Sequence, residues 1–320
     1  MLRMDGFEVH AARTPEEAVS LFGSLEDAHY VAGGTDLVPN LKHRIVPARH
    51  LVSLSTALPR GWRNENGEWI IGAGTRLSEL ARMSELKPLA EAAGLVAGPQ
   101  IRNMGTIGGN ILLDTRCLFF NQTLFWRKAL GYCLKAEGSW CHVVGGPKTC
   151  VATQSSDTVP VLLALGARIR LLGPNGSREL DLRSLYKFNG MDHLQIESAE
   201  LLTEVVVPDP GAGFRGSYTK LRMRGAIDFP QLGVAIIGTF DGDTASKLEI
   251  VVGAINPQPK PVRGLDAFLG KSLDDESVQA IGEMVHQQTR PQGSVQGDVP
   301  WRRRMARVFV ERGLRSLRNG

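Results

Sequence analysis

All four cysteines of this 320-residue chain fall within 34 consecutive residues. Four positions drawn at random along such a chain would cluster this tightly in roughly 0.5% of cases, so chance is a poor explanation. Disulfides are rare in the reducing cytoplasm, where we expect this chain to reside. The clustering therefore predicts that the segment folds around a metal ion or an iron–sulfur cluster, held by Cys117, Cys133, Cys141 and Cys150.

The spacing of the cysteines leaves the type of metal centre open. The gaps of 15, 7 and 8 residues lack the Cys-x-x-Cys pairs typical of structural zinc and the compact run of bacterial ferredoxins. Four thiolates can complete a tetrahedral zinc site or ligate the irons of a cubane 4Fe-4S cluster. His142 lies beside Cys141, and we interpret it as a neighbour because four thiolates are already present.

Composition argues against nucleic acid and membranes as partners. The 37 basic and 33 acidic residues give a net charge of +4, which provides only weak attraction to polyanions. No apolar run approaches the roughly 20 residues of a membrane span, and Asp5 and Gly6 stand where a signal peptide would be apolar. The arginine-rich residues 301–318 predict an amphipathic helix whose basic face is solvated or, as the alternative, forms a docking surface. We therefore expect a cytoplasmic protein.

Turn-forming residues predict two domains. Residues 208–213 (Pro-Asp-Pro-Gly-Ala-Gly) are dense in residues that break regular structure, so we place the domains at 1–211 and 212–320. In the first domain, Thr14, Pro15 and Glu17 signal the start of a helix that Gly23 can close. A helix capped by Thr75 and a hairpin turning at Asn66-Gly67 follow later in the domain. Strands are expected at 30–32, 50–54, 62–65, 68–71, 167–172 and 201–207, and further helices at 37–42 and 159–167.

The second domain shows strand signals followed by helix signals. Strands are expected at 217–223, 232–240 and 248–254, and helices at 274–287 and 300–317. The predicted fold class is α+β. A first domain with a small βαβ unit and a mixed α/β unit is followed by a C-terminal α+β domain with an antiparallel sheet and helices.

Two glycine-containing segments of the first domain are candidate phosphate-binding loops. In residues 32–37 (Ala-Gly-Gly-Thr-Asp-Leu) a strand passes into a helix, and adjacent glycines let backbone N–H groups approach a phosphate closely. Residues 106–110 (Thr-Ile-Gly-Gly-Asn) contain a second pair of adjacent glycines in the same domain. The first loop matches neither the dinucleotide fingerprint nor the Walker A loop, and both segments are also compatible with tight turns without a ligand. If the loops converge, they can cradle the two phosphates of a dinucleotide.

This pair of loops resembles the FAD-binding loops of the flavoprotein subunits of the molybdenum hydroxylases, the xanthine dehydrogenase and carbon monoxide dehydrogenase family. The resemblance implies that the FAD pyrophosphate is held by Ala32, Gly33, Gly34, Thr35, Asp36 and Leu37 together with Thr106, Ile107, Gly108, Gly109 and Asn110. It also implies that Asp157 binds the flavin nucleotide and that Lys220 lies near the isoalloxazine. Taken alone, a lysine in a strand is more typical of a partly exposed surface position.

The cysteine segment resembles, more narrowly, the insertion that distinguishes the beta subunits of the 4-hydroxybenzoyl-CoA reductases. The matching stretches are 114–117 (Asp-Thr-Arg-Cys), 131–135 (Gly-Tyr-Cys-Leu-Lys), 141–143 (Cys-His-Val) and Cys150. The resemblance implies an insert at about 114–152 in which Cys117, Cys133, Cys141 and Cys150 carry a 4Fe-4S cluster. Aromatic residues are expected to shield this cluster or simply to pack the insert, namely Phe119, Phe120, Phe125, Trp126, Tyr132 and Trp140.

The resemblance implies an oxidoreductase subunit that transfers electrons and has no catalytic residue at the substrate. A ferredoxin would deliver electrons to the cluster, and they would pass through FAD to a 2Fe-2S small subunit and a molybdopterin-binding large subunit. The three subunit types would form a heterohexamer that reduces 4-hydroxybenzoyl-CoA to benzoyl-CoA. Three alternatives remain: a FAD subunit of a related hydroxylase or dehydrogenase that oxidises an aromatic or purine substrate, a zinc-stabilised nucleotide-binding assembly module, and a free-standing flavin oxidase.

Overall fold

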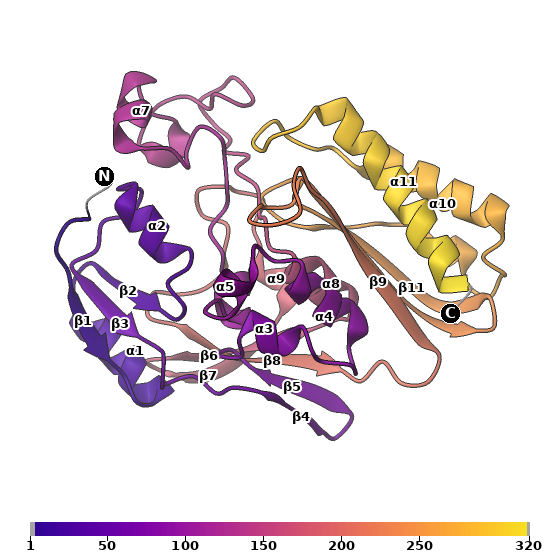
Figure 1. Ribbon diagram of the computed structural model, residues 1–320, viewed down its shortest axis with the longest axis horizontal. Helices are drawn as coiled ribbons and strands as arrows, with labels where there is room; N and C mark the ends of the chain where they lie inside the picture. The colour runs from indigo at the N-terminus through magenta and orange to yellow at the C-terminus, as the bar shows by residue number, and fades with distance from the viewer. Residues whose placement is uncertain (1–3, 319–320) are drawn as a thin grey trace.

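Three separate sheets organise the chain in the computed structural model, which describes residues 4–318. Figure 1 shows a small N-terminal sheet at one side, a mixed unit at the base, and a C-terminal sheet covered by two long helices at the other side. The cysteine-rich segment lies at the top, with its helix α7 above α2 of the N-terminal unit. This arrangement confirms the predicted α+β fold class.

The N-terminal unit is a parallel sheet with strand order β1-β3-β2. Its elements are β1 (Glu8–Ala11), α1 (Pro15–Ser24), β2 (Ala28–Val31), α2 (Leu37–Lys42) and β3 (His50–Ser53). The Thr14 hydroxyl accepts the amide of Glu17, and the Glu17 carboxylate accepts the amide of Arg13, so the predicted helix start is confirmed. The prediction that Gly23 closes this helix is wrong, because the helix continues to Ser24 and ends at an extended Leu25.

The mixed unit is built on an antiparallel sheet with strand order β4-β5-β8-β6-β7. Asn66 and Gly67 have φ of 53° and 76°, so the hairpin turns where the sequence predicts. Thr75 does not cap a helix as predicted: its hydroxyl donates to the Gly61 carbonyl, and helix α3 begins after Arg76. The strands are β4 (Trp62–Glu65), β5 (Glu68–Gly72), β6 (Arg168–Gly173), β7 (Gly176–Asp181) and β8 (Leu201–Pro208), and the helices are α3 (Leu77–Leu80), α4 (Lys87–Gly94), α5 (Pro99–Arg102), α6 (Ile107–Ile111), α8 (Thr158–Ala164) and α9 (Leu182–Leu185).

The C-terminal sheet has strand order β12-β11-β10-β9 and is buried on both faces. Along β10, Ala235 and Ile237 pack in the core of the first domain, while Val234 and Ile236 pack in the core formed with the last two helices. This alternation has the two-residue period of a strand. Since one face of the strand packs in each core, the sheet holds the two domains together. The elements are β9 (Phe214–Leu221), β10 (Leu232–Asp241), β11 (Thr244–Gly253), β12 (Lys260–Pro261), the 3-10 helix η2 (Leu265–Phe268), α10 (Asp275–Gln288) and α11 (Val299–Arg318).

The arginine-rich C-terminal helix is only partly as predicted. Arg302 is fully buried and donates to the carbonyls of Gln231, Gln292 and Ala254, so this arginine does not belong to a solvated face. Burial lowers its pKa to about 10. Arg304, in contrast, is exposed. Across the described residues, we find no helix with the length and apolar character needed to cross a bilayer.

The cysteine-rich segment connects α6 to α8 and contains little regular structure. It holds α7 (Leu124–Ala129) and the 3-10 helix η1 (Leu134–Ala136). Thr123 caps α7 through its hydroxyl, which accepts the amide of Trp126. The buried Arg127 of this helix donates to the carbonyls of His43 and Arg44 and thereby fixes the segment to the end of α2.

Candidate functional site

The first glycine loop connects β2 to α2 and contacts the turn before the second loop. Gly33 approaches this turn so closely that a Cβ atom would lie 2.0 Å from the carbonyl oxygen of Met104. Gly34 has a φ of 67°, in the left-handed region that glycine tolerates best. The structure therefore brings together the two segments that the sequence separates by about seventy residues, and only glycine fits at their junction.

The two loops differ in the hydrogen bonds available from their backbones. Within residues 4–318, the amides of residues 33–36 donate to no protein acceptor. In the second loop, the amides of Ile107, Gly108 and Gly109 already donate to the Thr75 carbonyl, the Ala73 carbonyl and the Thr106 hydroxyl. The first loop therefore has the backbone donors that an anionic group requires, whereas the second loop contributes close packing.

Asp36 ties the first loop to the cysteine segment. Its carboxylate forms an ion pair with Arg116 and accepts a hydrogen bond of 3.1 Å from Asn40 Nδ2. The Arg116 guanidinium lies 4.2 Å from the centre of the Phe229 ring, and burial lowers its pKa to about 10. Since Cys117 follows Arg116 directly, this partly exposed ion pair joins the loop to the cysteine segment.

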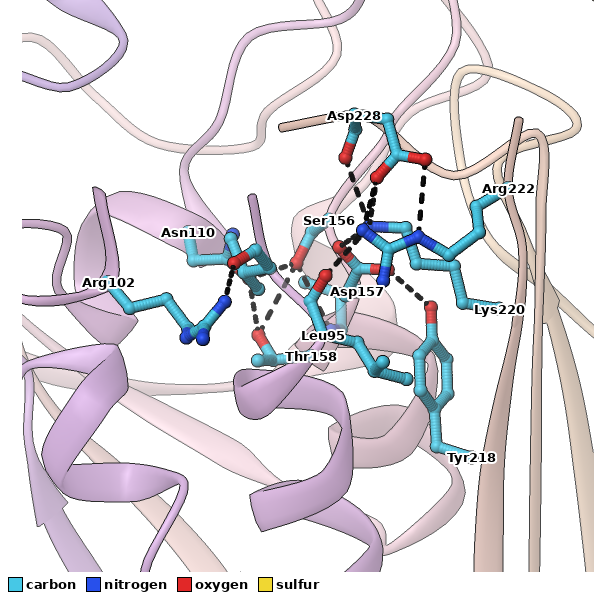
Figure 2. A network of polar contacts seen from close by, with 12 residues as sticks. Leu95, Arg102, Asn110, Ser156, Asp157, Thr158, Tyr218, Lys220, Arg222 and Asp228 are labelled. Atoms are coloured by element: carbon cyan, nitrogen blue, oxygen red, sulfur yellow. Dashed lines mark hydrogen bonds and ion pairs between the residues drawn. The ribbon is translucent and has the colours of Figure 1, made fainter. Parts of the chain in front are cut away.

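A buried polar network joins the two domains beside the second loop (Figure 2). Lys220 Nζ lies 3.0 Å from Asp157 Oδ2 and donates to the carbonyls of Leu95 and Asp228, each at 3.0 Å. The Tyr218 hydroxyl donates to Asp157 Oδ1 at 2.8 Å. The Lys220 side chain is fully buried, so a partly exposed surface position is ruled out for this lysine.

The charge of Asp157 is opposed by burial and favoured by its partners. Burial raises the pKa of this carboxyl to about 6, although the nearby Lys220 ammonium and the Tyr218 hydroxyl act in the opposite direction. Burial also raises the pKa of Tyr218 well above its ordinary value. Tyr218 therefore remains protonated and serves as a hydrogen-bond donor to the carboxylate.

Asn110 links the second loop to the same network. Its side-chain oxygen accepts hydrogen bonds from the hydroxyls of Ser156 at 2.6 Å and Thr158 at 2.7 Å. These residues flank Asp157 at the start of α8. The sequence suggests no role for Thr158, and the only available signal is its place next to Asp157.

The four cysteines are buried and line one common cavity. Among the described residues, no three of their sulfur atoms lie within 4.8 Å of one another. A single tetrahedral zinc ion with Zn–S bonds of about 2.3 Å requires sulfurs about 3.8 Å apart. As they lie, the four sulfurs therefore do not form a closed tetrahedral zinc site. Burial raises the pKa of the Cys117 thiol to about 11, so a bound cation is needed to stabilise its thiolate at neutral pH.

Lys135 is a charged residue in the lining of this cavity, and no sequence signal pointed to it. It lies 4.8 Å from the centre of the Phe120 ring and donates to Asp114 Oδ1 and Thr115 Oγ1, each at 2.5 Å. Its side chain is almost fully buried. These oxygen acceptors hold the ammonium in place, and its charge acts on the Cys150 thiol.

The other residues around the cavity follow the prediction only in part. Phe119, Phe120 and His142 line it, and His142 Nε2 donates to the Tyr132 carbonyl at 2.8 Å. Phe125 is 83% exposed and Trp140 is 50% exposed. The expectation that these two residues shield the centre is therefore wrong, because both project from the surface of the segment.

Two family models match the chain in succession. The FAD binding domain in molybdopterin dehydrogenase matches residues 5–210, and the CO dehydrogenase flavoprotein C-terminal domain matches residues 217–317. Together with the paired glycine loops, these matches define a two-domain FAD-binding protein of the molybdopterin dehydrogenase class.

Individual relatives agree with this class. The chain is 31% identical to the carbon monoxide dehydrogenase medium chain of Hydrogenophaga pseudoflava, with 96% of each chain covered, and 30% identical to the aldehyde oxidoreductase FAD-binding subunit PaoB of Escherichia coli, with 84% of this chain and 87% of the relative covered. Its fold matches the solved carbon monoxide dehydrogenase of Hydrogenophaga pseudoflava with a TM-score of 0.79 at 29% identity, covering 98% of each chain, and that of Oligotropha carboxidovorans with a TM-score of 0.81 at 26% identity, covering 99% of each. The chain belongs to the family of FAD-binding subunits of the molybdenum hydroxylases.

The raised pKa of Asp157 generates a pH prediction. A carboxyl whose pKa is higher in the folded state contributes stability at low pH and loses it as the pH rises through the folded pKa. We therefore expect the unfolding free energy of the wild type, relative to Asp157→Asn, to fall between about pH 4 and about pH 6 by on the order of 2–3 kcal/mol. Urea unfolding at several pH values measures this difference.

The exposed Asp241 provides a control for this titration, and Asp241→Asn should leave the pH dependence unchanged. If the unfolding free energy of the wild type, relative to Asp157→Asn, stays constant or increases with pH, burial does not destabilise the charged form of the Asp157 carboxyl.

Proposed function

We propose that this chain is the FAD and 4Fe-4S subunit of a molybdenum-dependent reductase of the 4-hydroxybenzoyl-CoA reductase type. The observation that carries the proposal is the single cavity lined by four buried cysteines, in a chain that belongs to a family of FAD-binding subunits. The chain transfers electrons and contributes no catalytic residue at the substrate.

FAD exchanges electrons singly or in pairs, so when bound it connects one-electron centres to two-electron chemistry. The proposed contacts are residues 32–37 and 106–110, Asp157 and Lys220. Unpaired amides at residues 33–36 support a phosphate contact for the first loop. Three oxygen acceptors hold Lys220, so its charge is fixed in position for the stabilisation of an anionic ring.

A 4Fe-4S cluster bound to Cys117, Cys133, Cys141 and Cys150 would supply a one-electron centre. Their common cavity supports a single group that all four cysteines ligate. Phe119 and Phe120 exclude water from the cavity, which affects the reduction potential of such a centre. The cysteine segment, at about 114–152, is proposed as an insert in a domain of residues 1–211, followed by a domain of residues 212–320.

The proposed partners follow the resemblance of the cysteine segment. They are a molybdopterin-binding large subunit, a 2Fe-2S small subunit and a ferredoxin donor, in a cytoplasmic heterohexamer that dehydroxylates 4-hydroxybenzoyl-CoA. A flavin that passes hydride directly to NAD needs no additional one-electron centre, and the cysteine cavity therefore favours the reductive direction. The second candidate is a FAD subunit of an oxidising dehydrogenase, because relatives carry names such as xanthine dehydrogenase and nicotinate dehydrogenase FAD subunit.

The first glycine loop can be tested with Gly34→Val. Gly34 has a left-handed φ of 67°, and its Cβ would lie 3.3 Å from Val38 Cγ2. Strain of about 1–2 kcal/mol in this conformation, added to the crowding, predicts at least tenfold weaker FAD binding. Gly211→Val is the matched control, since Gly211 has a φ of 71° and open space around it. Unchanged flavin content in Gly34→Val would remove this loop from the site.

The cysteine centre can be tested with Cys133→Ser. We expect the iron content of anaerobically purified protein to fall, while most of the FAD remains, because the two sites use different residues. His142→Gln should retain the iron, since His142 is assigned no ligand role. Equal loss of FAD and iron in Cys133→Ser would mean that the segment is needed for folding.

Lys135 is predicted to tune the reduction potential of the cysteine centre. The variant Lys135→Met removes a positive charge near thiolates that gain negative charge on reduction. At an effective dielectric constant of 20, a unit charge several Å from the cysteine centre interacts with its charge by a few kcal/mol. Because the Asp114 carboxylate offsets part of this interaction, we expect the midpoint potential to fall by on the order of 50 mV. An EPR-monitored redox titration measures it, with the exposed Lys128→Met as control. A midpoint that does not move, or rises, contradicts this role.

A further inference from the structure

Three potential metal ligands converge on the N-terminal sheet, far along the chain from the cysteines. Glu8 and His10 belong to β1, and His50 belongs to β3. Glu8 is the register partner of His50 in the parallel pair, and His10 follows Glu8 by two residues. Because strand residues alternate between faces, all three side chains lie on the same face of the sheet. Figure 1 shows β1 and β3 as neighbours.

The ligand atoms form a compact triangle with two sides of nearly equal length. His10 Nε2 lies 3.1 Å from His50 Nδ1, and Glu8 Oε2 lies 3.9 Å from the former and 3.8 Å from the latter. A point equidistant from all three atoms is about 2.1 Å from each, which is the length of zinc–nitrogen and zinc–oxygen bonds. A single ion can therefore contact all three side chains with small rotations.

The surroundings suit an ion with an open coordination position. The two imidazoles are about three-quarters buried, whereas the Glu8 side chain is 75% exposed and faces solvent. Three protein ligands would leave a fourth position for water. Two imidazoles with one carboxylate form a ligand set that suits borderline divalent transition metals better than Ca²⁺ or Mg²⁺, which prefer oxygen.

We propose that Glu8, His10 and His50 bind a divalent transition-metal ion of the zinc type. The site is independent of the proposed flavin and cysteine centres, because it uses neither the glycine loops nor a sulfur ligand. A bound ion would cross-link the edge strand β1 to β3 and stabilise the start of the N-terminal unit. The competing possibility is that His10 and His50 merely share a proton in their 3.1 Å hydrogen bond.

Cobalt(II) is the probe, because its absorption distinguishes ligand types. The tag-free full chain is titrated with Co²⁺, and a site of nitrogen and oxygen ligands gives visible d–d bands without the sulfur-to-cobalt charge-transfer band that cysteine ligands produce. We expect one such site per chain. Binding to His10→Gln and His50→Gln should be weaker by more than about 100-fold, since loss of even a residue that only hydrogen-bonds to a metal ligand costs about 10- to 100-fold.

His29→Gln is the matched control, because His29 lies on β2 of the same sheet and contacts the Pro47 carbonyl instead. This variant should bind Co²⁺ like the wild type. Circular dichroism establishes that each variant is folded before the titration. Bands that persist in His10→Gln and His50→Gln, or cobalt binding only with a sulfur charge-transfer band, would overturn the proposal and leave a shared proton as the role of the two histidines.

Discussion

The buried ion pair between Asp157 and Lys220 is the contact on which the arrangement of the site depends. Asp157 precedes α8 of the first domain, and Lys220 belongs to β9 of the second. Removal of one partner from a buried pair typically costs about 3–5 kcal/mol, because the other charge is left without compensation. Asn110 accepts hydrogen bonds from Ser156 and Thr158, which flank Asp157, so the ion pair also positions the second glycine loop. The domain interface and the candidate flavin site therefore share the same residues.

Arg116 extends this unit to the cysteine cavity. Its side chain pairs with Asp36 of the first loop and covers the Phe229 ring of the second domain, while its backbone forms a bridge with Thr153. Because Cys117 is the next residue, the Arg116 side chain, which is 15% exposed, connects the cysteine segment to the first glycine loop.

Features that depend on neighbouring residues could be predicted from the sequence. The capping at Thr14 and the turn at Asn66-Gly67 follow from local chemistry, and both are confirmed. Features that depend on contacts between distant parts of the chain could not be predicted from the sequence. The burial of Arg302 requires three carbonyls from other parts of the chain, and Thr75 is diverted from capping by the Gly61 carbonyl.

The candidate site shows the same division. The glycine pairs indicated where the two loops lie, but only the folded chain shows that the first loop keeps its amide donors while the second has used them. The clustering of the cysteines predicted a common centre, and the folded chain shows that all four line one cavity. The shape of that cavity depends on the irregular path of the segment, which the sequence pattern does not encode.

The central claim is that these four thiolates hold an iron–sulfur cubane in a flavin-binding chain. Its most direct test is the content of iron, acid-labile sulfide, zinc and FAD in protein purified without air. The account predicts about four irons and four sulfides per chain together with FAD. One zinc per chain with neither sulfide nor iron would contradict it.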